Sequence, residues 1–158
     1  MKNIMFIGKD KIEEARKAID KEYGKGVIAV KGGDNEFNRK VLENKKVDIL
    51  LSPERGGRKD RLKQGDSGLN HVLCRIARQN NIAIGIDFKE MLDKKEDEGK
   101  KQLAEHLRRI MQNIRLCKKA KTNMILMNKS GRDDYDLRAF LSTLGMPTDM
   151  AKRAVEGY

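Results

Sequence analysis

Residues 47–52 (VDILLS) and 82–87 (IAIGID) decide the fold, because each is a short, almost continuous run of Ile, Leu, Val and Ala. Three further runs share this character: residues 3–8 (NIMFIG), 26–31 (GVIAVK) and 123–128 (NMILMN). Strands that are apolar on both faces are typical of a parallel sheet, which is covered on both sides. Parallel neighbours need long crossover connections, and the intervening segments are long enough for helices. The sequence therefore predicts an α/β fold with five parallel strands.

The segments between these runs carry apolar residues at helical spacing. We expect the first helix to begin at Asp10, with Glu13 completing a variant of the capping box, and to end before Gly24. Tyr23 is expected on its inward face. Asp34 is expected to cap the second helix.

The third helix is expected to begin at Asp66 or Ser67. Its buried face would comprise Leu69, Val72, Leu73, Ile76 and Ala77. A long helix is expected over residues 100–120, with one narrow apolar stripe facing the core. Two shorter helices would close the chain, one stopping at Gly145 and one following Pro147.

Two architectures fit this alternation of strands and helices. One is an open, doubly wound sheet, and the other is an abbreviated version of the barrel that usually needs about 250 residues for eight strands. The length of 158 residues is typical of one domain, so we expect residues 1–158 to form a single α/β domain. In both architectures the functional loops follow the carboxyl ends of the strands.

The composition indicates a polyanionic partner. The chain has 35 Lys and Arg against 24 Asp and Glu, a formal net charge of +11. Cations placed near phosphates release condensed counterions on binding, which favours nucleic acid. No apolar run approaches a membrane span and no signal peptide is recognisable, so we expect a cytoplasmic protein. Cys74 and Cys117 lie in apolar helical patterns without a neighbouring ligand motif and are interpreted as small core residues.

The most distinctive loop follows residues 47–52. Between Glu54 and Lys63 its basic residues outnumber its acidic ones, and glycines allow a ligand to approach the backbone closely. The basic residues are Arg55, Arg58, Lys59, Arg61 and Lys63. Positive charge spread along a loop suits a sugar-phosphate backbone better than a small substrate. The alternative is a solvated insertion without a ligand.

A second basic surface is predicted on the long helix. Its members are spaced so that they fall in one stripe opposite the apolar one: Lys101, Arg108, Arg115 and Lys119. Such a stripe is often only the solvated face of a helix. Leu116 falls outside the apolar sector, which leaves open a contact with another protein.

The sequence predicts no catalytic or metal site. With only His71 and His106, a multi-histidine metal centre cannot be assembled. Asp48, Asp60 and Asp87 could bind Mg²⁺ through oxygens, but scattered carboxylates are expected by chance in a chain with 24 acids. No nucleophile elbow or phosphate-binding glycine loop is present.

Several segments together identify a family. Residues 47–53 (VDILLSP), 58–60 (RKD), 66–73 (DSGLNHVL) and 82–92 (IAIGIDFKEML) resemble archaeal ribonuclease P protein component three. Further matching segments are residues 32–39 (GGDNEFNR), 113–121 (NIRLCKKAK), 136–138 (DLR) and 144–146 (LGM).

The resemblance implies a barrel of the triosephosphate isomerase type and a role in ribonuclease P, the endoribonuclease that removes 5′ leaders from precursor tRNA. In that ribonucleoprotein the RNA carries the catalytic centre with Mg²⁺, and this subunit binds no cofactor of its own. The resemblance also implies pairing with protein component two. Before Gly26 the chain has one predicted strand and one predicted helix, where family members have more. We therefore expect a TIM-barrel-like βα repeat that is abbreviated or incompletely closed at its N-terminus.

The leading hypothesis is therefore a non-catalytic, RNA-binding subunit of ribonuclease P. The basic loop would contact phosphates, and Ser67 and His71 would order the start of the adjoining helix. Two rival hypotheses remain open: a free-standing α/β phosphoesterase, and a protein-binding module that docks through its long helix.

Overall fold

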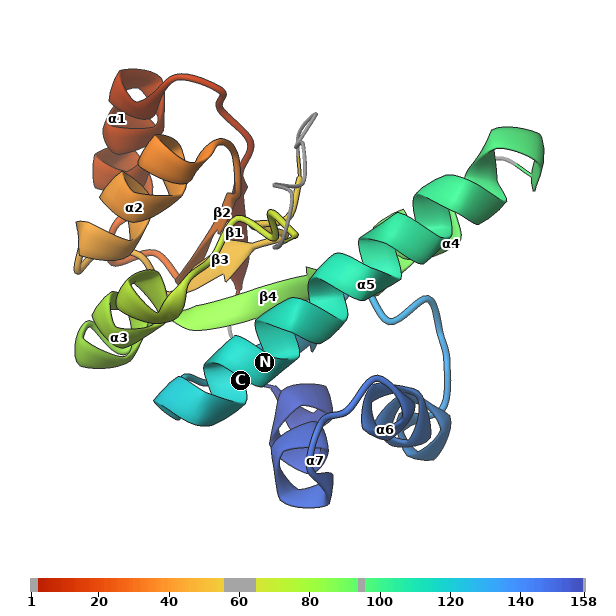
Figure 1. Cartoon of the computed structure of the whole chain (residues 1–158). Helices are drawn as coiled ribbons and strands as arrows, with labels where there is room; N and C mark the ends of the chain where they lie inside the picture. Colours follow the sequence, from red (N-terminus) through yellow and green to blue (C-terminus); the bar gives the residue numbers. More distant parts are fainter. Residues whose placement is uncertain (1–2, 56–64, 94–95, 158) are drawn as a thin grey trace.

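A curved, five-stranded parallel sheet forms the centre of the computed structural model, which describes residues 3–55, 65–93 and 96–157 (Figure 1). The strands lie in the order of the chain: β1 (Ile4–Ile7), β2 (Val27–Lys31), β3 (Ile49–Leu51), β4 (Ala83–Asp87) and β5 (Met124–Met127). Each lies within its predicted range and each neighbouring pair is parallel, so the predicted strands are confirmed.

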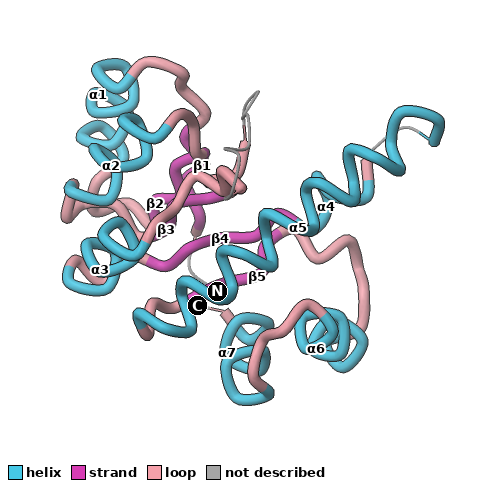
Figure 2. Tube along the Cα trace, viewed as in Figure 1, coloured by secondary structure: helices cyan, strands magenta, loops and turns pink. Residues whose placement is uncertain are grey.

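The strand order decides between the two predicted architectures. A doubly wound sheet reverses its strand order and carries helices on both faces. Here the order runs from β1 to β5 without reversal, and the helices follow one another around the sheet (Figure 2). This is the arrangement of a TIM-barrel-like βα repeat, as predicted. Among the described residues β1 and β5 do not pair with each other, so the sheet is not closed.

Each face of the sheet has its own apolar core. Because side chains alternate along a strand, Ile28 and Val30 of β2 join the large core beneath the helices, whereas Val27 and Ala29 join a smaller cluster on the other face. Both faces are therefore buried, which explains why the strands read as continuous apolar runs.

The helices connect and follow the strands. Their bounds are α1 (Ile12–Glu22), α2 (Asn35–Glu43), α3 (His71–Gln79), α4 (Phe88–Leu92), α5 (Glu96–Ala120), α6 (Asp134–Thr143) and α7 (Thr148–Glu156). In the part of the chain that the structure describes, no helix combines the length and apolarity that a membrane crossing requires.

Two predicted helix starts are wrong. Helix α1 begins at Ile12 with Lys11 as its N-cap and no side-chain cap hydrogen bond, so the expected capping box at Asp10 does not form. Helix α3 begins only at His71, because Gly68 has a φ of +80° and interrupts the chain before a helix can start. Asp34 does cap α2, accepting a 2.8 Å hydrogen bond from the amide of Phe37.

Two expected core residues are exposed. Tyr23 is 60% exposed because it lies beyond the last turn of α1, with Lys46 Nζ 5.4 Å from the centre of its ring. Val72 is 43% exposed, because Leu73, Cys74 and Ala77 form the buried side of α3 and Val72 lies outside it.

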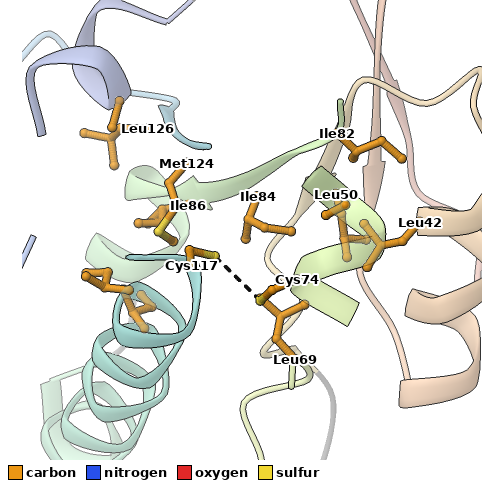
Figure 3. Close-up of a cluster of buried hydrophobic side chains, with 14 of the residues drawn as sticks. Leu42, Leu50, Leu69, Cys74, Ile82, Ile84, Ile86, Cys117, Met124 and Leu126 are labelled. Atoms are coloured by element: carbon orange, nitrogen blue, oxygen red, sulfur yellow. Dashed lines mark hydrogen bonds between the residues drawn. The ribbon is translucent and has the colours of Figure 1, made fainter. Parts of the chain in front are cut away.

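The predicted burial of the two cysteines is confirmed. Cys74 on α3 and Cys117 on α5 are both fully buried and free, with their sulfurs 4.0 Å apart (Figure 3). The hydrogen bond to Cys74 and burial together hold the pKa of the Cys117 thiol above its usual range. This sulfur contact lies where α3 and α5 pack together over the sheet.

Candidate nucleic-acid interface

The basic loop predicted from the sequence leaves the sheet at the carboxyl end of β3. Ser52 is buried, has a φ of +52°, and its amide donates to the carbonyl of Gly85 on β4. A non-glycine residue in this left-handed region is held by its surroundings rather than by its own preference. The loop therefore departs from the sheet in a fixed direction.

One buried side chain joins the two ends of this loop. Asn38 of α2 donates hydrogen bonds to the carbonyls of Pro53 (3.1 Å) and Gly68 (3.2 Å), and its oxygen accepts one from the amide of Gly33 (2.8 Å). Pro53 begins the loop and Gly68 ends it. The amide of Asn38 thus fastens both ends to the loop that follows β2.

Helix α5 holds the same loop from the other side. His106 Nε2 lies 2.8 Å from Glu54 Oε1, and both side chains are almost completely buried. Further along the helix, Gln112 donates to the carbonyl of Gly65 at 2.9 Å and Asn113 donates to the carbonyl of Ser67 at 3.2 Å. A loop tied to two helices by buried polar contacts has little freedom at its base.

The predicted phosphate contacts of the loop fall partly outside the described residues. Arg55 is half-buried and pairs with Glu90, its Nε lying 3.2 Å from Glu90 Oε1. Arg55 therefore braces the loop against α4 in this structure. The other four predicted contacts lie outside the described residues: Arg58, Lys59, Arg61 and Lys63.

Ser67 and His71 differ in their surroundings. Ser67 is 1% exposed, and its hydroxyl has no hydrogen-bond partner within the described ranges. The cap of α3 is instead Asn70, whose oxygen accepts a 2.9 Å hydrogen bond from the amide of Leu73. His71 is exposed at the first position of the helix, where it can meet a ligand.

The predicted stripe on α5 is exposed and lies beside the loop. All four members are exposed: Lys101, Arg108, Arg115 and Lys119. Gln112 lies four residues after Arg108 and three before Arg115, so it shares their side of the helix. Because the amide of Gln112 contacts Gly65, the stripe borders the carboxyl end of the loop. The stripe and the described end of the loop, which are far apart in sequence, are therefore neighbours in the fold.

The candidate magnesium carboxylates are engaged in structural hydrogen bonds. Asp87 accepts from the amide of Glu90 and from the Asn128 side chain, which engages both of its oxygens. Asp48 accepts from the amide of Ile28, tying the start of β3 to β2, and Asp60 lies outside the described residues. Among the described residues, no group of three or more potential metal-binding side chains lies together.

A polar cavity of about 290 Å³ opens beside the loop base, lined by Glu54, Arg55, Glu90, Gln102, Glu105, His106 and Arg109. Its lining mixes carboxylates with cations, so it has no single strong charge preference. The residues of the Arg55–Glu90 and His106–Glu54 contacts line this cavity, and both contacts hold the base of the loop in place.

Sequence reasoning missed the side chains that fasten the loop. Asn38 follows the core residue Phe37, and Asn113 lies three residues after Ile110 in the apolar stripe of α5. An amide within an apolar stripe indicates a buried hydrogen bond, and this signal was available. The pairing of Glu54 with His106 had no such signal, because 52 residues separate them.

Comparisons with known proteins agree on one family. A family model described as RNase P subunit p30 matches residues 9–158. Ribonuclease P protein component 3 of Methanococcus maripaludis is 34% identical over 151 residues, which cover 90% of this chain and 59% of that protein. The protein of the same name from Methanocaldococcus jannaschii is 35% identical over 135 residues, which cover 82% of this chain and 53% of that protein.

A solved structure gives the same answer for the fold. The cryo-EM structure of archaeal ribonuclease P with mature tRNA contains a similar chain, with a TM-score of 0.74 and 32% sequence identity. The match covers 94% of this chain and 62% of that one, so the present chain spans rather more than half the length of its relatives. From its sequence and its fold together, the chain belongs to the RNase P subunit p30 family.

Proposed function

We propose that this chain acts as a protein subunit of ribonuclease P, binding and supporting the RNA that carries the catalytic centre. Its relatives are named as ribonuclease P protein component 3, and its structural neighbour comes from archaeal ribonuclease P with mature tRNA. The proposal assigns the chain no catalytic residue. Mg²⁺ would be held by the RNA, because the chain's candidate carboxylates Asp48 and Asp87 already bond to the protein.

One observation carries this proposal. The base of a basic loop is fastened at the carboxyl edge of the sheet, and it lies beside an exposed basic stripe on α5. The stripe presents positive charge along an exposed helix surface rather than around a small cavity, and the loop cations Arg58, Lys59, Arg61 and Lys63, which lie outside the described residues, are proposed to extend it. Such a surface fits a sugar-phosphate backbone.

The partners follow from this assignment. Ribonuclease P RNA would contact the loop and the stripe, and precursor tRNA would be the substrate of the assembled particle. A second protein subunit, component two, is proposed as the neighbouring protein.

The first test uses substitutions in the loop. Changing Arg58 and Lys59 together to Ala should weaken binding to the ribonuclease P RNA and make log K against log salt less steep by roughly one to two units, because two phosphate contacts are lost. The matched control changes Arg16 and Lys17 to Ala, which are exposed on α1 far along the chain from the loop. An unchanged slope in the loop variant would remove these two residues from the interface.

The second measurement addresses the function itself. Precursor-tRNA cleavage is reconstituted from the RNA and the remaining subunits, with and without this chain. We expect cleavage to depend on the chain at limiting Mg²⁺. Equal cleavage without it, or phosphoester turnover by the chain alone, would contradict the proposal.

A further inference from the structure

Helices α3 and α5 run side by side in the same direction. At one end, the Asn113 side chain bonds to the carbonyl of Ser67, just before α3. Further along, the sulfur of Cys117 meets that of Cys74, and the hydroxyl of Thr122 donates to the Cys74 carbonyl at 2.7 Å. Later residues of the α5 segment contact later residues of the α3 segment, as expected for two parallel helices. Figure 1 shows α3 beside the C-terminal part of α5.

Helix α3 carries a basic row of its own. His71, Arg75 and Arg78 are four and three residues apart and all are exposed, so they form one line along the helix surface. His71 and Arg78 lie three residues before and four after Cys74, the residue that faces α5. The row therefore borders the seam between the two helices.

The row on α5 lies on the exposed side of that helix, opposite its apolar stripe. Arg108, Arg115 and Lys119 are seven and four residues apart, and Gln112, which shares their side of the helix, donates a hydrogen bond to the carbonyl of Gly65 in the loop before α3. Helices α3 and α5 pack directly against each other, so the two rows lie on the exposed sides of neighbouring helices. Exposed cations are thus present on both of these neighbouring helices.

Two segments that contain α3 and the C-terminal part of α5 carry most of the excess positive charge of the chain. Residues 67–86 and 106–132 contain ten of the 35 basic residues and none of the 24 acidic ones. Nearly all of the net charge of +11 therefore belongs to these two segments, while the rest of the chain is almost neutral. Neither segment contains an acidic residue of its own, although Lys129 in the second segment pairs with Asp134 just beyond it.

The composition of these two segments also indicates whether single-stranded or double-stranded RNA would bind to them. Neither segment contains Phe, Tyr or Trp, so neither provides the aromatic rings on which single-stranded bases stack. Double-stranded RNA is recognised mostly by its shape and by contacts to its phosphates and ribose hydroxyls. Two parallel rows of cations match that mode of recognition.

We propose that the two rows form one binding surface for the backbone of helical RNA, in which Arg75 and Arg78 of α3 contact phosphates together with Arg108, Arg115 and Lys119 of α5. This inference rests on the proposed function, and it names the RNA-contacting face and the double-stranded form of the ligand. It extends the interface from the loop and one helix to the exposed sides of two neighbouring helices.

The test changes Arg75 and Arg78 together to Ala in the full chain. Both side chains are exposed and Ala favours helix, so the variant should fold, which circular dichroism and thermal melting check. Binding is measured to a double-stranded RNA of about 20 base pairs over a range of salt concentrations. We expect the slope of log K against log salt to become less steep by about one to two units. The Arg16 and Lys17 double Ala variant, which removes the same charge from α1, should keep the slope.

The outcomes separate this inference from the proposed function. If the unaltered chain binds RNA and the Arg75/Arg78 variant keeps its salt slope, the claim that the α3 row contacts RNA is overturned, while the proposed function is unaffected. If a single strand of equal length binds as tightly as the duplex, the assignment of helical RNA is overturned. If the unaltered chain neither binds RNA nor supports cleavage in the reconstituted particle, the proposed function fails.

Discussion

At the scale of single residues, Asn38 has the largest influence on the candidate interface. Its side chain is 0% exposed and makes three hydrogen bonds to backbone groups of three different segments. Buried backbone groups need partners, because leaving one unpaired costs free energy. Asn38 supplies these partners where the loops after β2 and β3 meet.

Changing Asn38 to Ala should lower the free energy of unfolding by about 2–4 kcal/mol, because the amide of Gly33 and the carbonyls of Pro53 and Gly68 lose their partner. Urea unfolding measures this. Asn38→Asp should also destabilise, since it keeps an acceptor for Gly33 but loses both donors. Gln79→Ala, an exposed change on α3, should remain within about 0.5 kcal/mol. A similarly small effect at Asn38 would show that the amide does not hold the loop.

At the scale of elements, the backbone segments after β2 and β3 touch directly. A Cβ at Gly32 would lie 2.6 Å from Pro53 Cα and 2.7 Å from the Ser52 oxygen, both backbone atoms that cannot move aside cheaply. Gly8, at the corresponding end of β1, has only Lys31 Cδ within 4 Å of such a Cβ, at 3.6 Å. Two glycines at neighbouring strand ends therefore serve different purposes.

These two glycines give a matched comparison. Gly32→Ala should destabilise the protein by about 1–3 kcal/mol, because the strand ends would have to separate. Gly8→Ala should be neutral or stabilising by up to about 1 kcal/mol, because the unfolded chain loses freedom without any close contact in the folded state. Thermal or urea unfolding of both variants decides, and equal effects would contradict the close approach at Gly32.

At the scale of the whole molecule, the two edges of the open sheet differ. All residues of β5 are buried, and α7 packs against that strand. In β1, Ile4 and Phe6 are 37% and 51% exposed, although the register places them beside Val27 and Ala29 on the smaller apolar face. The sheet is therefore covered at one edge and uncovered at the other.

This asymmetry predicts the pattern of amide hydrogen exchange. Peptides from β1 should exchange fastest among the five strands, and β4, which is paired on both sides and buried throughout, should be among the slowest. Strand β5 should exchange more slowly than β1, although both are edges. Equal protection of β1 and β4 in mass-spectrometric exchange would contradict this prediction.

The strands and most helices could be predicted because their signals are local. Apolar runs such as residues 47–52 indicate strands that are buried on both faces. Asp34 marks a helix start because its side chain can cap the helix, and Gly145 marks a helix end because glycine accepts a positive φ. The start of α3 was misplaced because Asp66 and Ser67 also look like caps, and only the φ of Gly68 in the folded chain selects Asn70. The basic residues of the candidate site were visible, but the amides that fasten the loop were not recognised.

The sequence by itself determined the α/β class, the parallel strands, the excess of positive charge and the family, because each is written in residue types and short spacings. Only the tertiary structure decided that the strands follow one another without reversal, that Asn38 and His106 fasten one loop, and that the two helices with exposed basic rows, α3 and α5, pack side by side. These facts depend on contacts between residues far apart in the chain, and such contacts are set by packing of the whole fold rather than by any local pattern.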